Sequence, residues 1–225
     1  MNLETEAANL EHMTAKILAQ RIVFLAAVFA TLFGVLYFIG LAGKLIVDGT
    51  VHSSSSQSVQ IVSAIVAILL DLALLIMFVA LRWQISGRNS VFADLAVVFM
   101  TLVCATSSIN WFVQLAILPR ISQGDNSAML ALVDVHNDSS IMYAIEHLGW
   151  GVFYGLATIF IAIAMSSGKL ENWIRWLFMA GGALSLLHVV GIVTTNPVIG
   201  DLGYLAWGIL LPITTTLLAI RFRRN

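Results

Sequence analysis

Charged residues are scarce in this sequence. Asp, Glu, Lys and Arg make up only 10% of the 225 residues, whereas 60% are hydrophobic. A soluble domain carries about a quarter charged residues, so this chain lacks the charge that a water-facing surface needs. We expect lipid, rather than water, to surround most of it. The formal net charge of −1 also leaves no basic excess for binding nucleic acid.

Cysteine is nearly absent, and no cleavable leader is evident. The single cysteine, Cys104, excludes an intramolecular disulfide framework and a cysteine-based zinc cage. It stands in an apolar stretch and is interpreted as a packing residue. The N-terminus carries Glu4, Glu6 and Glu11 instead of the basic region that begins a signal peptide. The first membrane helix is therefore expected to act as its own insertion signal.

What the chain has instead is a series of long apolar runs. A transmembrane helix needs roughly 20 mostly apolar residues. Six runs of this kind occupy about residues 21–46, 61–83, 91–118, 140–165, 173–195 and 201–220. We predict an all-α fold, a polytopic membrane protein whose residues 20–225 form a bundle of six transmembrane helices. Residues 1–19 are predicted to be a polar, amphipathic segment, either a short helix at the membrane surface or a frayed tail.

Basic residues predict the orientation of the bundle. Nine of the 11 Lys and Arg residues fall on one side of the six-helix arrangement, and only Lys44 and Arg120 fall on the other. Loops rich in Lys and Arg stay in the cytoplasm, so both termini are predicted to be cytoplasmic. The loops near residues 48–60, 120–139 and 196–200 should then face outward.

Ionisable residues within the spans are the best pointers to function, because each costs about 2.5–3.5 kcal/mol at a helix centre. Glu146 and His147 on the fourth span, and His188 on the fifth, lie about two turns below the outer ends of their helices. Asn110 and Gln114 on the third span lie at a similar depth. With a rise of about 1.5 Å per residue, these five groups differ in depth by only a few residues and can meet in the outer half of the membrane.

Helical spacing also groups these polar residues with aromatic ones. Tyr143, His147 and Trp150 form one stripe on the fourth span, and Trp111 and Gln114 share a face of the third. Apolar walls with a few converging polar groups are typical of a small-ligand site. We therefore predict an outward-facing pocket that binds a small or amphipathic ligand in a sensor, a carrier or a lipid-binding protein. Its predicted lining residues are Asn110, Trp111, Gln114, Tyr143, Glu146, His147, Trp150 and His188.

Other functions stay open for the same cluster. An intramembrane enzyme could use Glu146, His147 and His188 for acid–base or zinc chemistry, although adjacent residues lie about 100° apart on a helix and do not readily share one metal. Haem held between His147 and His188 would give an electron-transfer protein. No His-Glu-x-x-His or nucleophile-elbow motif is present, and neither haem nor zinc is favoured. Each polar residue could also be a purely structural hydrogen-bonding partner between helices.

Asp71 is a separate buried ionisable residue. It lies near the middle of the second span, among leucines. A bare charge is untenable in hydrocarbon, so we expect this carboxyl group to be protonated or paired. It can reach the predicted pocket from below or find a partner elsewhere.

Small residues and one proline predict how the spans pack. Gly151 and Gly155 have the Gly-x-x-x-Gly spacing that lets helices approach closely, and Gly181 and Gly182 should act similarly on the fifth span. Pro212 is expected to kink the last span and to free a main-chain carbonyl group. No internal repeat is evident.

The C-terminal half also resembles known proteins. Residues 147–165 are followed by a tryptophan-containing segment at 170–176 and by small residues at 181–183. This succession resembles a family of small bacterial membrane proteins of unknown function with about six spans, over residues 60–220. The resemblance implies a bacterial inner membrane and a topology, but no activity and no residue role. The ligand and the oligomeric state stay unassigned.

Overall fold

The computed structural model describes residues 3–48, 57–121, 127–166 and 168–223, which form helices and short connections without a strand among them. Six helical segments are long and apolar enough to cross a membrane, as the sequence predicts. They are Met13–Gly40, Ile61–Gln84, Gly87–Ile121, Ile141–Ala164, Lys169–Val193 and Pro197–Phe222. The predicted all-α, multi-pass membrane fold is therefore confirmed.

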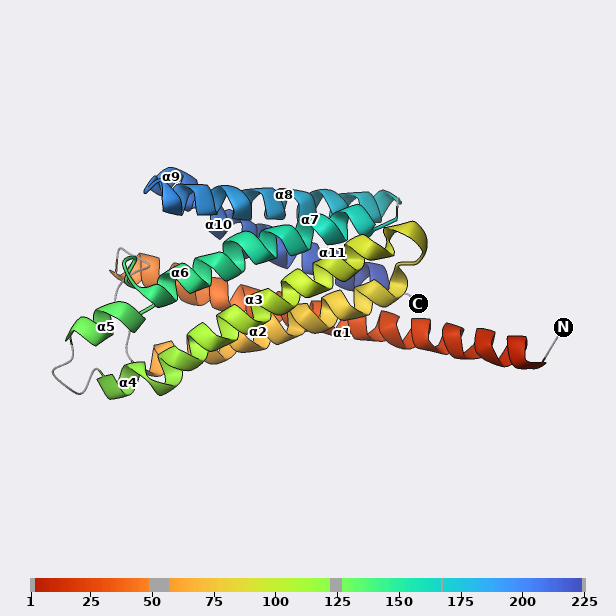
Figure 1. Ribbon diagram of the computed structural model, residues 1–225, viewed down its shortest axis with the longest axis horizontal. Coiled ribbons are helices and arrows are strands. Elements are labelled where there is room, and N and C mark those ends of the chain that lie inside the picture. Colours follow the sequence, from red (N-terminus) through yellow and green to blue (C-terminus); the bar gives the residue numbers. More distant parts are fainter. Residues whose placement is uncertain (1–2, 49–56, 122–126, 167, 224–225) are drawn as a thin grey trace.

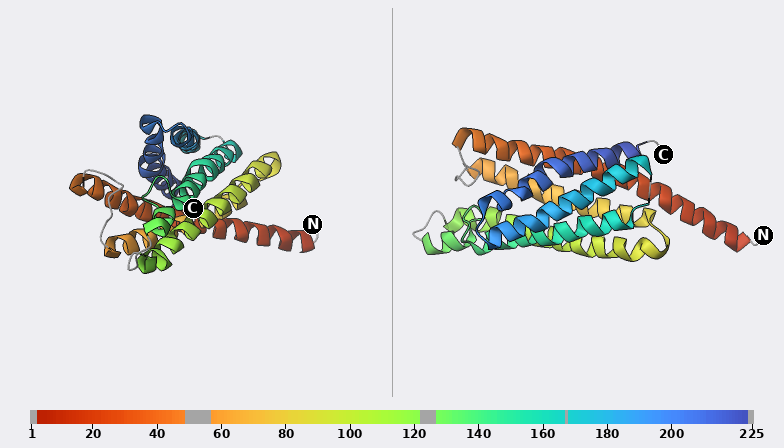
Figure 2. Two further views of the ribbon diagram at one scale, coloured as in Figure 1. Left: turned by 60° about the vertical axis from the view of Figure 1, so that its left-hand side comes forward. Right: turned by 90° about the horizontal axis from the view of Figure 1, so that it is seen from above.

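The spans are built from elements that follow one another along the chain (Figure 1). In order, they are α1 (Leu3–Asp48), α2 (Gln57–Gln84), η1 (Gly87–Asn89), α3 (Ser90–Ala116), α4 (Leu118–Ile121), α5 (Ser127–Val133), α6 (Ile141–His147), η2 (Leu148–Phe153), α7 (Tyr154–Ala164), α8 (Lys169–Val193), α9 (Pro197–Gly200), α10 (Leu202–Leu205), η3 (Ala206–Leu210) and α11 (Leu211–Phe222). Each long helix packs against the next, and α11 packs against α1, so the six spans close into a ring (Figure 2).

The first helix is longer than a membrane span requires. Its 46 residues correspond to about 69 Å at 1.5 Å per residue, more than twice the roughly 30 Å of a hydrocarbon core. It runs from Leu3 to Asp48 without a break, so the predicted polar segment of residues 1–19 and the first span lie on one helix over the described residues. This extension projects beyond the bundle at the end where the C-terminus lies (Figure 1).

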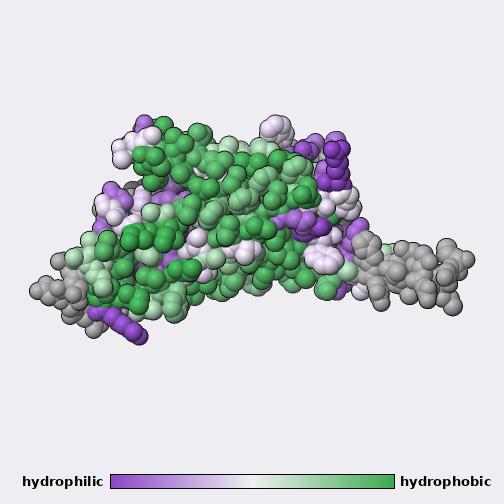
Figure 3. All heavy atoms as spheres, viewed as in Figure 1, coloured by the Kyte–Doolittle hydropathy of each residue, from purple (hydrophilic) through white to green (hydrophobic). Residues whose placement is uncertain are grey.

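Ion pairs join neighbouring helices at the end of the bundle that carries both termini, which we call the inner end. Arg82 at the end of α2 pairs with Asp94 near the start of α3, and Arg221 of α11 pairs with Glu171 of α8. Hydrophilic side chains gather mostly toward the two ends of the visible face, and apolar side chains cover its middle (Figure 3). This distribution matches a bundle whose middle faces lipid.

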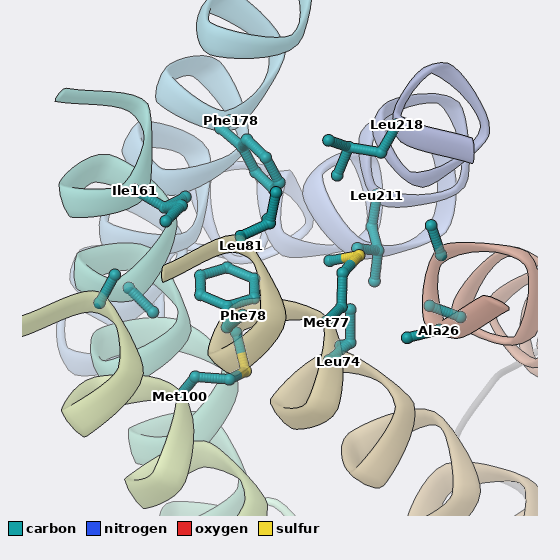
Figure 4. Close-up of a cluster of buried hydrophobic side chains, with 14 of the residues drawn as sticks. Ala26, Leu74, Met77, Phe78, Leu81, Met100, Ile161, Phe178, Leu211 and Leu218 are labelled. Atoms are coloured by element: carbon teal, nitrogen blue, oxygen red, sulfur yellow. The ribbon is translucent and has the colours of Figure 1, made fainter. Parts of the chain in front are cut away.

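An apolar core fills the inner half of the bundle. Phe78 of α2 and Phe178 of α8 meet edge to face, with ring centroids 5.9 Å apart. Side chains of α1, α3, α7 and α11 close around this pair (Figure 4). Their most buried members include Met77, Met100, Ile161, Leu211 and Leu218. The core therefore separates the inner end from the polar residues of the outer half.

Glycines bring the fourth and fifth spans into close contact, as predicted. A Cβ atom added to Gly155 would lie 3.1 Å from the main-chain oxygen of Gly182, and one added to Gly151 would lie 3.5 Å from that of Ser185. Gly182 takes part in this contact, whereas a Cβ atom at Gly181 would meet no described atom within 4 Å. The close approach of the two backbones brings the residues preceding Gly151 against the outer part of α8.

Two π-helical turns, η2 and η3, interrupt the fourth and sixth spans in the outer half. The second one explains how the chain accommodates Pro212, which cannot donate a hydrogen bond to the main-chain oxygen of Gly208. The wider π-helical turn just before the proline lets the helix continue without this hydrogen bond. Thr214 Oγ1 donates to the main-chain oxygen of Leu210 at 2.6 Å. The expected disturbance at Pro212 thus takes the form of a π-helical turn.

Candidate functional site

Two histidines from different spans meet in the outer half of the bundle. His147 ends α6, and His188 lies on the outer part of α8. The distance between His188 Nε2 and His147 Nδ1 is 2.7 Å, which is a hydrogen bond. The other ring nitrogen of His188 bonds the main-chain oxygen of Gly200, which ends α9. The structure therefore joins the two predicted histidines in one hydrogen-bonded chain across three elements.

The carbonyl group of Gly200 determines where the protons of this chain lie. A carbonyl oxygen can only accept, so His188 Nδ1 carries a proton and donates it. When both rings are neutral, His188 Nε2 accepts from His147 Nδ1, and Nε2 is then the acceptor nitrogen of His147. With one further proton on the pair, an N–H still lies between the two rings, so the central hydrogen bond persists.

Aromatic rings pack directly on the two histidines. The ring centroid of Tyr143 lies 4.0 Å from that of His147, and the centroid of Trp207 lies 4.8 Å from that of His188. The ring centroid of Trp150 on η2 lies 5.8 Å from that of Trp207 on η3. The two π-helical turns thus supply the tryptophans of the cluster. An aromatic wall of this kind suits the apolar body of a ligand.

Hydrogen bonds of the indole groups fix this wall. Trp207 Nε1 donates to the main-chain oxygen of Trp150 at 3.1 Å and to Ser185 Oγ at 3.0 Å. Trp150 Nε1 donates to Ser107 Oγ of α3 at 3.3 Å. These bonds connect η2, η3, α3 and α8 around the histidine pair. The wall is therefore positioned by hydrogen bonds as well as by packing.

Glu146 belongs to a second hydrogen-bonded chain, on the α3 side. Asn110 Nδ2 donates to Glu146 Oε2 at 2.7 Å. Gln114 Nε2 donates to the main-chain oxygen of Val133 at 2.7 Å and lies 3.5 Å from Asn110 Oδ1, while its Oε1 accepts from Val135 N. The structure thus brings Asn110, Gln114 and Glu146 together. It also ties them to the connection that follows α5.

Asp71 and Trp111 are buried polar residues of the same cluster. Asp71 is fully buried, and its carboxyl group lies within hydrogen-bonding reach of the Ser107 side chain and within electrostatic range of Glu146. Trp111 lies within hydrogen-bonding reach of the Glu146 carboxyl group. Neither the Asp71 carboxyl oxygens nor Trp111 Nε1 makes a well-formed hydrogen bond with a described residue, whereas buried polar groups normally do.

Access to the cluster is best along α6. Tyr143, Glu146 and His147 are half-buried, whereas His188 and Trp150 are buried. The rings around the histidines pack on one another, so a ligand with a sizeable body would have to displace side chains on this side. Val135 packs against Trp111 at the outer end of α3 and partly covers it.

The histidine pair does not fit a metal as it stands. A tetrahedral metal that binds two imidazole nitrogens at about 2.0–2.1 Å each would hold those nitrogens roughly 3.3 Å apart, whereas the facing nitrogens are 2.7 Å apart. The ring centroids of His147 and His188 are 4.7 Å apart and the ring planes are inclined by 45°, which leaves no gap for a porphyrin between them. The described residues also contain no group of three His, Cys, Asp or Glu side chains spaced to hold a metal ion.

Two aromatic residues near the cluster were missed by the sequence reasoning. Trp207 contacts both histidines, and Tyr37 of α1 lies within electrostatic range of Asp71 and Glu146. Trp207 lies about as far below the outer end of its span as His188 does, and that depth could have identified it. Tyr37 gave no such signal, because the sequence does not reveal which face of α1 looks into the bundle.

Comparison with models of known protein families, with curated proteins and with solved structures finds no match. The resemblance of residues 60–220 to a family of bacterial membrane proteins therefore stays a prediction.

Proposed function

We propose that the outer half of this membrane protein binds a small or amphipathic ligand, in a sensing, carrying or lipid-binding role. The observation that supports this proposal is the convergence of polar side chains from α3, α6 and α8 beside an aromatic wall. Polar groups at this depth are costly, and the inner half of the same bundle is closed by apolar side chains. The polar side chains that are costly in the membrane therefore gather in the half of the bundle that a ligand could enter from outside.

The half-buried groups indicate the chemistry of such a ligand. Glu146 and His147 are half-buried polar side chains on the accessible side, and the carboxyl oxygens of Glu146 are hydrogen-bond acceptors. Tyr143 and the neighbouring tryptophans provide apolar surface. A ligand that carries hydroxyl or amine donors on an apolar body complements this arrangement.

The alternative of an intramembrane enzyme has less support. Acid–base catalysis requires the acid and the base to reach the same reacting group. Glu146 is turned toward Asn110 of α3, whereas His147 is turned toward His188 of α8. Because the two side chains diverge, a binding role fits the geometry better.

We further propose a bacterial inner membrane with both termini cytoplasmic, on the basis of the basic residues at the inner end and the resemblance described above.

Native mass spectrometry of gently purified protein tests the binding function. We expect the wild-type protein to carry a non-covalent mass that His147→Ala and Glu146→Gln lose, because the first removes the imidazole of the cluster and the second its carboxyl group. His136→Ala is the matched control, since it removes an imidazole from the outer connection next to Asp134. The proposal fails if folded wild-type protein carries no added mass even in native lipid, or if both site variants retain it. A Soret band in the absorbance spectrum would instead indicate haem.

A further inference from the structure

One face of α3 carries a stripe of buried hydrogen-bonding groups. Its members are Ser107, Asn110, Trp111 and Gln114. They are three or four residues apart and therefore lie on one side of the helix, and none is more than 6% exposed. At the outer end, Gln114 Nε2 donates to the main-chain oxygen of Val133. The stripe rises by about 10 Å, compared with the roughly 15 Å from the middle of a hydrocarbon core to its edge.

This stripe joins two carboxyl groups at different depths. Asn110 Nδ2 donates to Glu146 Oε2 at 2.7 Å on the accessible side of the cluster. Deeper in the bundle, the Asp71 carboxyl group lies within hydrogen-bonding reach of Ser107 and within electrostatic range of Glu146. Ser107 Oγ accepts from Trp150 Nε1 at 3.3 Å, which leaves its hydroxyl hydrogen for Asp71. The two acids thus interact along the same face of α3.

No Lys or Arg side chain among the described residues forms an ion pair with either acid. The other titratable groups that interact with them are the Tyr37 phenol of α1 and the Cys104 thiol of α3. His147 follows Glu146 in the chain, but its ring is turned toward α8. A carboxylate without a counter-ion is untenable in hydrocarbon, so a proton is the simplest group that can neutralise Asp71.

Beyond Asp71, toward the inner end, the interior is apolar. The α2 face that carries Asp71 continues with Leu74 and Phe78. The α3 face that carries the stripe continues with Val103 and Met100. All four of these side chains are fully buried. A proton on Asp71 therefore has hydrogen-bonding groups only on its outer side.

We propose that the α3 stripe is a proton path from the outer side of the membrane that ends at Asp71. In each transfer, the O–H bond of the Glu146 carboxyl group breaks and an O–H bond forms on the Asp71 carboxylate. Glu146 then takes the next proton from water, and Asp71 releases its proton by the same path. Acidic groups within a membrane serve as proton relays in pumps and transporters. The path needs no other ligand, so it stands even if the proposed ligand binding fails.

Infrared spectroscopy of the full-length protein in lipid, titrated from pH 5.5 to pH 9.5, tests the path. A protonated carboxyl group has a C=O stretching band apart from the amide bands. Exposed carboxyl groups, with pKa values of about 4, are ionised throughout this range. We expect the wild type to lose such bands as the pH rises, and Asp71→Asn and Glu146→Gln each to remove one component. Asp94→Asn, which removes an exposed carboxylate paired with Arg82, is the matched control and should change nothing.

The interaction between the two acids has its own signature. In Glu146→Gln, the remaining Asp71 component should disappear at a pH at least one unit lower than in the wild type, because no second carboxylate opposes its ionisation. An unshifted component would contradict the pairing. If Asp71→Asn does not fold, Ser107→Ala decides, since loss of the hydroxyl group should change the frequency of the Asp71 band. An unchanged frequency would refute the contact.

Proteoliposomes with a buffered interior and unequal orientation test the side of entry. Asn196 lies in an exposed turn at the outer end, so labelling of Asn196→Cys with an impermeant maleimide counts the molecules whose outer face points outward. After a step in the external pH, the same fraction of the Asp71 band should respond. Any other responding fraction would contradict entry from the outer side. A folded wild type without a carboxyl band that titrates in this range would overturn the inference.

Discussion

Adjacent glycines on α8 differ sharply in their surroundings, and this difference predicts opposite effects of the same substitution. A Cβ atom at Gly182 would lie 2.6 Å from the main-chain oxygen of Gly155 and 2.7 Å from Thr158 Oγ1. A Cβ atom at Gly181 would meet no described atom within 4 Å. A backbone oxygen cannot rotate away as a side chain can. Gly182→Ala must therefore push α7 and α8 apart, whereas Gly181→Ala needs no adjustment.

The expected magnitude follows from two opposing contributions. Replacing a helical glycine by alanine stabilises a helix by about 0.5–1 kcal/mol, and this gain applies to both variants. Overpacking costs about 1–3 kcal/mol, and it applies to Gly182→Ala alone. The helix gain cancels in the comparison, so Gly181→Ala should be more stable than Gly182→Ala by about 1–3 kcal/mol.

Unfolding by SDS in mixed micelles, followed by circular dichroism, measures this difference. The wild-type protein should lie between the two variants or close to Gly182→Ala. Equal stability of the two variants would show that the fourth and fifth spans do not touch through their backbones. In that case, the contact that brings His147 to His188 would also lose its basis.

Two further predictions concern the tryptophan wall and the orientation. Trp207→Phe keeps an aromatic ring but removes the indole donor that bonds Trp150 and Ser185, so SDS unfolding should show a loss of about 0.5–1.5 kcal/mol; unchanged stability would contradict these bonds. For the orientation, Cys104 is buried and can be replaced by serine. In that background, Asn196→Cys should react with an impermeant maleimide on intact cells, and Arg88→Cys should react only after permeabilisation. The reverse pattern would invert the proposed topology.

The six spans could be predicted because length and hydropathy are local properties of the chain. Depth matching was equally local, since it counts residues from the end of a helix, and it selected His147 and His188, which the structure places in contact. Gly155 could be recognised from spacing alone, because only close backbones need glycine at that position.

The remaining features depend on which spans are neighbours, and the sequence does not contain that information in a local form. The closure of the ring by α1 and α11 brings Tyr37 toward the polar residues and was not predictable from either helix. The unbroken course of α1 through its charged first residues was missed because those charges indicated a separate element. The depth of Trp207 in its span matches that of His188, but only the packing of η3 against α8 shows that it joins the cluster.

The π-helical turn that follows His147 has a consequence for chains that differ in length. A π turn accommodates one residue more than an α turn, and one residue corresponds to about 100° of rotation around a helix axis. Deleting a single residue within Leu148–Phe153 would therefore convert the π turn into an α turn and keep His147 on its face of the helix. The same deletion within the α-helical segment Tyr154–Ala164 has no wide turn to take it up, so it would turn His147 away from its partner. Two such chains could share every polar residue of the cluster and still differ in whether the imidazoles meet.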